Sequence, residues 1–462
     1  MGVPDSIRLV KSPNLIAIPV GRGYLVYNSL EGGPVVLNEE GYSVLALFGV
    51  ARSLKEVRKD FTITGLGRWV KKMVDWKFLI QEGADERVYF HRKTERAIKR
   101  IARGQHLISL GLVLDEACNF NCSYCVSKKL IVASGRSASG MSRMTWEVAQ
   151  KSLDSFFAYA RDCGHKKLEI YFGGSEPLLN WSVLQKTIEY CHSKYNPEFG
   201  FRFSMNTNAS LITQERAVFL ANNRVTVTSS LDGPEVANDA VRTGNSNKDT
   251  FTRIIAGWDH LGDNKRRVEW FCLTLTDDNI DAIDESFFDF LASRKIRSCS
   301  FEPDLINPLK RDPEELVSCL LRFKEWGEVR KITVGGLWCK PFQNMFSRSN
   351  KPNLFNCSAF TGRGISVLPS GEVVLCTYSA TKIGAVEDLK AVFKSRAFME
   401  LLTSRAVGNI EECHGCEIEG LCMGGCYLTP EYCSLIGSDN AFRYRCALYK
   451  IATRRLLHMA CR

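Results

Sequence analysis

Residues 107–302 alternate between short apolar runs and longer amphipathic segments, and no other feature restricts the possible folds as much. Strands are predicted at 107–114, 168–172, 200–205, 224–230, 267–275 and 297–302. Helices are predicted between them at 146–162, 181–195, 213–222, 250–261 and 280–293. Strands that alternate with helices pair in parallel, through right-handed crossovers. The expected fold class is therefore α/β, with a parallel sheet.

Polar or glycine-rich segments follow four successive predicted strands. A cysteine-rich loop at 117–126 follows the first strand, and Tyr-Phe-Gly-Gly-Ser-Glu-Pro at 171–177 follows the second. Met-Asn-Thr-Asn at 205–208 follows the third, and Ser-Ser-Leu-Asp-Gly-Pro at 229–234 follows the fourth. In parallel barrels the chemistry gathers at the C-terminal ends of the strands. We therefore expect these four segments to share one face of the sheet.

The first of these loops carries Cys118, Cys122 and Cys125 in the spacing C-x3-C-x2-C. Iron–sulfur clusters are held by cysteine thiolates, and a four-iron cluster commonly takes four of them, so three close ligands would leave one iron open. With Tyr124 before the third cysteine, the loop resembles that of the radical S-adenosylmethionine (SAM) enzymes. The resemblance implies a partial (β/α)6 TIM-type barrel and a [4Fe–4S] cluster that binds SAM. It also implies a 5′-deoxyadenosyl radical that abstracts hydrogen from substrate.

The segments after the next strands continue this resemblance. The paired glycines let the backbone come close to a ligand because they carry no side chain, and Glu176 offers a carboxylate to the SAM ammonium. Ser175 is an extra residue relative to the family's Gly-Gly-Glu-Pro segment. Arg242 can pair a carboxylate with two hydrogen bonds. The residues implied to bind SAM are Tyr124, Gly173, Gly174, Glu176, Asn208, Ser230 and Arg242.

Cysteine density rises again toward the C-terminus. A hairpin signal at 369–372 lies between two cysteines, and a C-x2-C-x5-C-x3-C run begins at residue 413. The pattern resembles the SPASM extension of radical SAM peptide maturases, which holds two auxiliary [4Fe–4S] clusters and brings the expected total to three. The first would take Cys357, Cys376 and Cys426, with Cys339 as the nearest candidate for a fourth ligand. The second would take Cys413, Cys416, Cys422 and Cys446.

Three questions about these cysteines stay open at the level of sequence. The spacing also suits zinc sites. Cys433 lies inside the final gap and could replace Cys446. If Cys339 is not a ligand, an iron of the first auxiliary cluster could bind a substrate thiolate directly.

Residues 1–95 predict strands, three short helices and a wing strand, with Asn38 and Ser53 beginning helices. This pattern resembles the winged-helix domain that recognises the leader of ribosomally made precursor peptides, by pairing an extended leader with a sheet edge. A DNA-binding winged helix and a purely structural cap are the alternatives. The expected domains are 1–95 for leader recognition, 96–310 for the barrel, 311–345 for a bridging helix region and 346–462 for the SPASM extension.

Composition limits the cellular setting. The net charge is +10, but Lys and Arg are spread along the chain, so a nucleic-acid partner is not expected. No apolar run reaches the roughly 18 residues of a membrane span, and the first residues, Met-Gly-Val-Pro-Asp-Ser, do not have the basic-then-apolar pattern of a signal peptide. Eighteen cysteines without a secretion signal favour metal ligation in a reducing cytoplasm over disulfides.

These observations together predict a radical SAM enzyme that modifies a ribosomally made precursor peptide. Thioether formation is the favoured reaction, with flavodoxin or ferredoxin as electron donor. Carbon–carbon or ether crosslinking, epimerisation and formylglycine maturation of a sulfatase are the alternatives. The sulfatase-maturing family places Asp after the second SPASM cysteine, where this chain has Thr377. A winged-helix regulator that senses redox state through its clusters is a further alternative, but it would need no SAM pocket. No side chain is assigned a catalytic role from the sequence.

Overall fold

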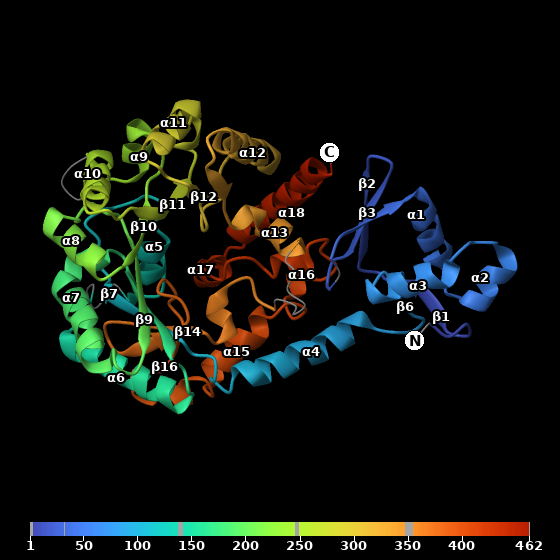
Figure 1. The fold of residues 1–462 in the computed structure, drawn as a ribbon, viewed down its shortest axis with the longest axis horizontal. Helices are drawn as coiled ribbons and strands as arrows, with labels where there is room; N and C mark the ends of the chain where they lie inside the picture. The colour runs from blue at the N-terminus through green and yellow to red at the C-terminus, as the bar shows by residue number, and fades with distance from the viewer. Residues whose placement is uncertain (1–2, 32, 137–141, 245–248, 347–353, 462) are drawn as a thin grey trace.

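Figure 1 shows the computed structural model, which describes residues 3–31, 33–136, 142–244, 249–346 and 354–461. The N-terminal part (blue) lies at one end, and helix α4 (Glu86–Ile101) runs from it to a curved sheet. Helices lie around the outside of this sheet, and the C-terminal elements (orange and red) lie between the sheet and the N-terminal part. No helix within the described ranges is both long and apolar enough to cross a membrane.

Parallel strands form most of the central ten-stranded sheet, in the order β13-β12-β11-β10-β9-β8-β7. The strands are β7 (Ser109–Asp115), β8 (Lys167–Gly174), β9 (Gly200–Thr207), β10 (Thr226–Ser230), β11 (Val268–Leu275), β12 (Ser298–Pro303) and β13 (Thr333–Gly335). All six predicted strands occur in sequence order, and β13 adds a short seventh. The expected α/β class with a parallel sheet is confirmed.

Half of the eight helices named here around the sheet begin at residues whose side chains cap them. The eight are α5 (Val126–Ala133), α6 (Trp146–Asp162), α7 (Trp181–Tyr190), α8 (Gln214–Asn222), α9 (Glu235–Val241), α10 (Thr250–Asp263), α11 (Glu285–Ser293) and α12 (Pro313–Val329). The Thr145 hydroxyl accepts a hydrogen bond from the Val148 amide at the start of α6. Helix α11 begins later than the predicted residue 280, because the Asp284 carboxylate accepts from the amides of Ser286 and Phe287.

The C-terminal region is built onto the same sheet. Strand β14 (Gly364–Val367) pairs in parallel with β7, and β15 (Glu372–Val374) and β16 (Lys382–Ala385) continue the sheet antiparallel. The hairpin expected near residue 370 therefore joins β14 to β15. The remaining elements are α13 (Lys340–Met345), α14 (Leu389–Val392), α15 (Arg396–Arg405), α16 (Glu419–Cys422), α17 (Leu428–Ile436) and α18 (Asn440–Ala460). Cys376, just after β15, thus lies near the strand that precedes the cysteine loop.

The N-terminal part has two small sheets and its own core. One sheet has the order β5-β1-β6 and the other β2-β3-β4. Their elements are β1 (Arg8–Lys11), β2 (Leu15–Val20), β3 (Gly23–Asn28), β4 (Val35–Asn38), α1 (Glu39–Ala46), β5 (Arg52–Ser53), α2 (Leu54–Asp60), α3 (Leu66–Asp75) and β6 (Leu79–Gln81). Asn38 and Ser53 cap α1 and α2 as expected. Val26, Phe48 and Val70 are among the side chains that fill the core between them.

A short docking contact fixes the N-terminal part to the C-terminal region. The Gly420 amide donates a hydrogen bond of 2.7 Å to the Ser29 carbonyl. A Cβ on Gly420 would lie 2.2 Å from the Leu30 carbonyl oxygen, so only glycine permits this approach. Beside it, the Arg87 guanidinium donates to both oxygens of the buried Glu419 carboxylate, at 3.0 and 2.8 Å. This contact lies between two cysteines of the predicted second auxiliary site, Cys416 and Cys422.

Candidate active site

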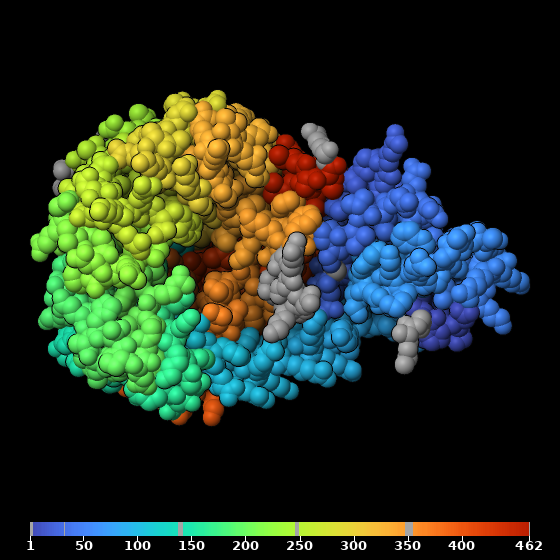
Figure 2. Space-filling model, in the orientation of Figure 1, coloured from blue at the N-terminus to red at the C-terminus, as the bar shows by residue number. Residues whose placement is uncertain are grey.

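One cavity of about 260 Å³ lies at the C-terminal ends of the parallel strands. Each of the four predicted strand-end segments contributes to its wall, so the structure brings together residues that are far apart in the sequence. The surface is hollowed where the barrel (green and yellow) meets the C-terminal region (orange and red) (Figure 2). The cavity is lined by Cys118, Phe120, Cys122, Tyr124, Cys125, Val126, Ser127, Gly174, Ser175, Asn206, Thr207, Asn208, Ser230, Arg242, Cys272, Thr274, Glu302, Pro303, Leu305 and Tyr378.

The three cysteines of the loop after β7 face this cavity together. The Cys118 sulfur accepts hydrogen bonds from the Phe120 amide at 3.3 Å and from the Asn208 side-chain amide at 3.8 Å. Burial raises the pKa of Cys118 to about 12 and that of Cys122 to about 11. Binding of iron at neutral pH would therefore release protons from these thiols.

Within the described residues, no three or more His, Cys, Asp or Glu side chains are arranged to hold one metal ion. The iron–sulfur assignment and its zinc alternative therefore both rest on the cysteine spacing in the sequence.

A buried ion pair between Arg242 and Asp232 lies next to the cysteine loop. The Arg242 Nε donates to the Asp232 carboxylate at 2.7 Å, and Nη1 lies 3.8 Å from the Cys122 sulfur. The Tyr124 hydroxyl donates to the same carboxylate, and the guanidinium lies 5.6 Å from the centre of the Tyr124 ring. Burial lowers the pKa of Arg242, but Asp232 raises it strongly, so the guanidinium stays charged. Arg242 thus lines the cavity with part of its hydrogen-bonding capacity already used.

Asp232 was missed as a functional residue at the level of sequence. It is fully buried and also accepts a hydrogen bond of 2.9 Å from the Thr274 amide. The signal was present, because Asp232 is the acidic residue of the segment that follows the fourth strand. Its partner could not be read from the sequence, since only the fold brings Arg242 beside it.

The structure does not place Glu176 at the cavity. Its carboxylate is fully buried and accepts hydrogen bonds from the Leu178 amide at 3.0 Å, the Thr207 hydroxyl at 2.7 Å and the Asn208 amide at 2.8 Å. These contacts tie the ends of β8 and β9 together. The preceding residue, Ser175, lines the cavity instead, so the extra residue noted in the sequence changes which side chain faces inward.

The two glycines before Ser175 have different surroundings. Gly174 lines the cavity with φ +114°, and a Cβ there would lie 2.5 Å from the Asp115 carbonyl oxygen. Gly173 does not line the cavity, and a Cβ on it would lie 2.6 Å from the Thr377 methyl group. Gly173 therefore permits the close approach of the segment after Cys376 to the barrel.

The C-terminal cysteines form two groups. Burial is the main cause of the raised pKa of Cys376, and the charges of the Cys426 and Cys357 thiolates raise it further. For Cys413 and Cys422, the neighbouring thiols are Cys446 and Cys416. The structure therefore brings together Cys357, Cys376 and Cys426 as one group, and Cys413, Cys416, Cys422 and Cys446 as the other.

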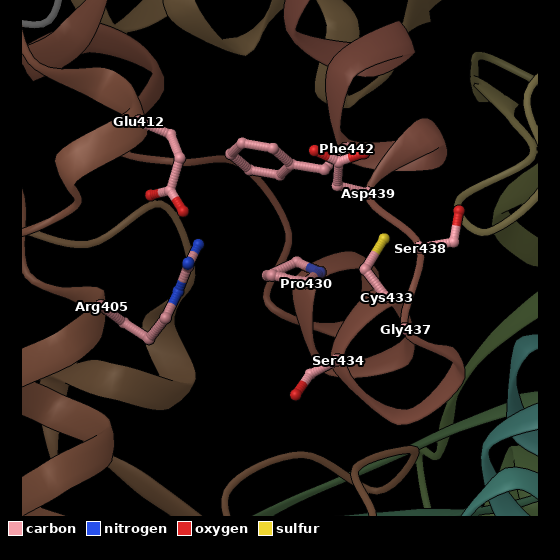
Figure 3. A pocket seen from close by; sticks show the side chains of 9 residues that line it. All are labelled: Arg405, Glu412, Pro430, Cys433, Ser434, Gly437, Ser438, Asp439 and Phe442. Atoms are coloured by element: carbon pink, nitrogen blue, oxygen red, sulfur yellow. The ribbon is translucent and has the colours of Figure 1, made fainter.

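Cys339 and Cys433 have other neighbours. The Cys339 thiol donates to the Gly336 carbonyl at 3.1 Å, and the charged residues that most affect its pKa are Glu302 and Lys324. The Cys433 thiol lines a separate cavity of about 500 Å³, with Arg405 and Glu412 on the opposite wall (Figure 3). Within the described part of the chain, these contacts join neither thiol to the two groups.

A buried arginine lies beside both groups. Arg445 donates hydrogen bonds to the Thr429 hydroxyl and, at 2.9 Å, to the Cys426 carbonyl. Burial raises the pKa of Cys426 in the first group and of Cys422 and Cys446 in the second, and the Arg445 charge partly opposes this rise. Within the described residues Arg445 forms no ion pair with a carboxylate, although it is 6% exposed. A buried cation needs a compensating anion, and cluster-bound thiolates on either side would supply it.

The parallel strands and the cysteine loop at their C-terminal ends agree with the arrangement expected from the sequence. Residues 113–290 match the family model of the radical SAM superfamily. The protein is accordingly an enzyme with a radical SAM domain in this segment, and that domain implies a [4Fe–4S] cluster and SAM as cofactors.

Curated relatives and solved structures agree with this assignment. The radical SAM cyclopropyl synthase TigE of Paramaledivibacter caminithermalis is 25% identical over 94% of this chain and 92% of its own length. A cysteine-type anaerobic sulfatase-maturating enzyme of Clostridium novyi is 23% identical over 70% of this chain and 89% of its own. The structure of anSMEcpe with bound AdoMet has a TM-score of 0.60 at 19% identity, covering 76% of this chain and 98% of that chain. The last likeness establishes the fold.

Proposed function

We propose that this enzyme modifies a peptide by removing hydrogen from one of its residues. The observation that carries the proposal is the convergence of the cysteine loop, Arg242 and three further strand ends on one cavity. The whole-length likeness to TigE, named a cyclopropyl synthase, and the likeness to the sulfatase-maturating enzymes support a peptide or protein as substrate. When bound, the cluster and SAM supply a 5′-deoxyadenosyl radical, which is the reactive species of the site.

The chain's own residues would hold and shield these groups. Cys118, Cys122 and Cys125 would ligate the cluster, and Arg242 would keep a positive charge beside the Cys122 sulfur. Tyr124 forms a wall of the cavity above the Arg242 guanidinium. The remaining SAM contacts would come from Gly174, Ser175, Asn208 and Ser230, all of which line the cavity.

We further propose two auxiliary [4Fe–4S] clusters, one on each C-terminal cysteine group. The group with Cys446 offers four thiols, and the group with Cys376 offers three. Because the contacts of Cys339 lie elsewhere, the three-cysteine group leaves one ligand position for a thiolate from the substrate. This supports formation of a thioether between a peptide cysteine and a carbon atom. A ring closed on carbon is the second candidate, favoured by the likeness to TigE.

The N-terminal part would bind the leader of the precursor peptide. Strand β6 lies at an end of its sheet, and beside it a groove of about 580 Å³ is lined by Val74, Ile80 and Tyr89 among others. An extended peptide could add to β6 and place apolar side chains in this groove. The contact between Ser29 and Gly420 would keep the bound leader close to the barrel and raise the local concentration of the core peptide.

The proposal is tested by anaerobic reconstitution. The reduced enzyme, with flavodoxin, ferredoxin or dithionite as donor, should contain iron and sulfide for three clusters and convert SAM to 5′-deoxyadenosine. Cys122→Ala should abolish this conversion, while the matched variant Cys191→Ala, at a fully buried thiol outside the cavity, should retain it. Absence of 5′-deoxyadenosine from the reconstituted wild type would refute the proposed activity.

The bond formed is tested with peptides encoded beside the gene. Co-expression followed by mass spectrometry should show loss of two hydrogen atoms from such a peptide. Alkylation with iodoacetamide then separates the two candidates. A thioether removes one thiol that can be alkylated, whereas a ring closed on carbon leaves every thiol reactive.

A further inference from the structure

Glu302 occupies a distinctive place in the cavity. It lies at the C-terminal end of β12 and lines the same cavity as the cysteine loop. Among the lining residues of the described chain, it is the sole carboxylate, since Asp232 and Glu176 lie behind the wall. The position after Cys376, which faces Gly173, is Thr377 and carries no acid.

The carboxylate of Glu302 accepts hydrogen bonds but has no ion-pair partner among the described residues. The Ser300 hydroxyl donates to Oε1 at 2.6 Å, and the Leu337 amide donates to Oε1 at 2.9 Å and to Oε2 at 3.0 Å. No lysine, arginine or histidine of the described residues forms an ion pair with it. Burial raises the pKa of Glu302 to about 7, against the lowering effect of these hydrogen bonds. The group can therefore hold or release a proton near neutrality.

Glu302 also lies close enough to the first C-terminal cysteine group to interact with it electrostatically. Its charge contributes to the raised pKa of Cys426 of that group and of Cys272 in the cavity wall. The Arg445 charge in turn partly opposes the rise in the pKa of Glu302. The carboxylate is thus near both the cavity and the cysteines proposed to hold an auxiliary cluster.

We propose that Glu302 is the catalytic base that accepts the proton lost by the peptide. This rests on the proposed function, in which the peptide loses two hydrogen atoms. One would leave as a hydrogen atom when a substrate C–H bond breaks, taken by the radical that the cluster and SAM supply. The other would leave as a proton and an electron. For a thioether the S–H bond breaks when the peptide thiolate takes the open ligand position, and for a ring closed on carbon a second C–H bond breaks as the ring forms. Glu302 accepts this proton, and the electron left when the new bond forms to the radical carbon would pass to an iron–sulfur cluster as one-electron acceptor.

The proton-accepting role is tested first without any peptide. Difference infrared spectra of the reconstituted holoenzyme between pH 5 and pH 9 should contain the carbonyl band of a protonated carboxyl that ionises near pH 7. Glu302→Gln should lose this band, and Glu198→Gln, at a surface ion pair, should keep it. If the Glu302 carboxyl stays protonated up to pH 9, it cannot serve as the base and the proposal is overturned.

The second measurement uses the peptide encoded beside the gene. Glu302→Gln should still form 5′-deoxyadenosine and still transfer deuterium to it from labelled peptide. Modified peptide per 5′-deoxyadenosine should fall about a hundredfold, the scale of a lost general base, and Glu302→Asp should restore part of it. An unchanged ratio in Glu302→Gln would refute the base, whereas a wild type that makes no 5′-deoxyadenosine would refute the proposed function instead. Thermal unfolding confirms that the variant is folded, because glutamine can still accept from the Leu337 amide.

Discussion

Replacing Asp232 with asparagine would leave Arg242 as a buried cation without its anionic partner. The guanidinium and carboxylate lie 2.7 Å apart, with side chains 8% and 0% exposed. Removing one partner of such a buried pair destabilises a protein by about 3–5 kcal/mol, because the remaining charge stays desolvated. Removing both charges, with Asp232→Asn and Arg242→Gln together, should therefore destabilise by much less than the sum of the two single changes.

Urea unfolding of the cluster-free protein, followed by circular dichroism, measures this double-mutant cycle. The control is the surface pair of Arg161 and Glu198, which has a similar length of 2.6 Å but is 53% and 31% exposed. Glu198→Gln should change the free energy of unfolding by about 1 kcal/mol or less. A loss of under about 1 kcal/mol in Asp232→Asn, or strict additivity in the cycle, would refute the reasoning from burial.

Four further predictions concern the cavity and the clusters. Gly174→Ala should destabilise the protein by more than about 1 kcal/mol in thermal or urea unfolding, because its Cβ would meet the Asp115 carbonyl oxygen at 2.5 Å and φ is positive. Since the folded-state pKa of Glu302 is raised from 4.5 to about 7, the free energy of unfolding should fall as pH rises through this interval. Glu302→Gln should lessen the fall, and an equal change in the free energy of unfolding between pH 5 and pH 8 in the two proteins, measured by urea unfolding, would contradict it. The rate of peptide modification should rise as the pH increases through about 7 in the wild type. In Glu302→Gln this rate should not change with pH. Cys446→Ser should lower the iron content of the reconstituted protein, whereas Cys433→Ser should not, as measured by iron and sulfide analysis.

The sequence predicted where the parallel strands lie along the chain, because the local pattern of apolar residues indicates each strand. Apolar runs at 168–172 and 267–275 are strands in the structure, and the capping residue Asn38 begins a helix as expected. Polar segments after four strands were expected to meet, and the strand-end rule holds for each of them. The cysteine spacing and the family resemblance predicted the loop and both C-terminal groups, and their role as cluster ligands stays a prediction.

Features that depend on tertiary partners could not be read in the same way. The pairing of β14 with β7 joins residues 364 and 109, and no local pattern specifies it. Cys272 on β11 lines the cavity, and the sequence around it does not indicate this. Glu176 matched a family motif, yet its backbone partners hold it behind the wall.

The docking contact between the N-terminal part and Gly420 has a consequence for the choice of substrates. Arg87 and Ser29 form hydrogen bonds with the segment between Cys416 and Cys422. A peptide bound at the proposed leader site would therefore be held at a fixed distance from the cavity. The number of residues between its captured stretch and its reactive residue would then act as a ruler. Peptides with a shorter spacer would fall short of the radical, and those with a longer one would present a different residue to it.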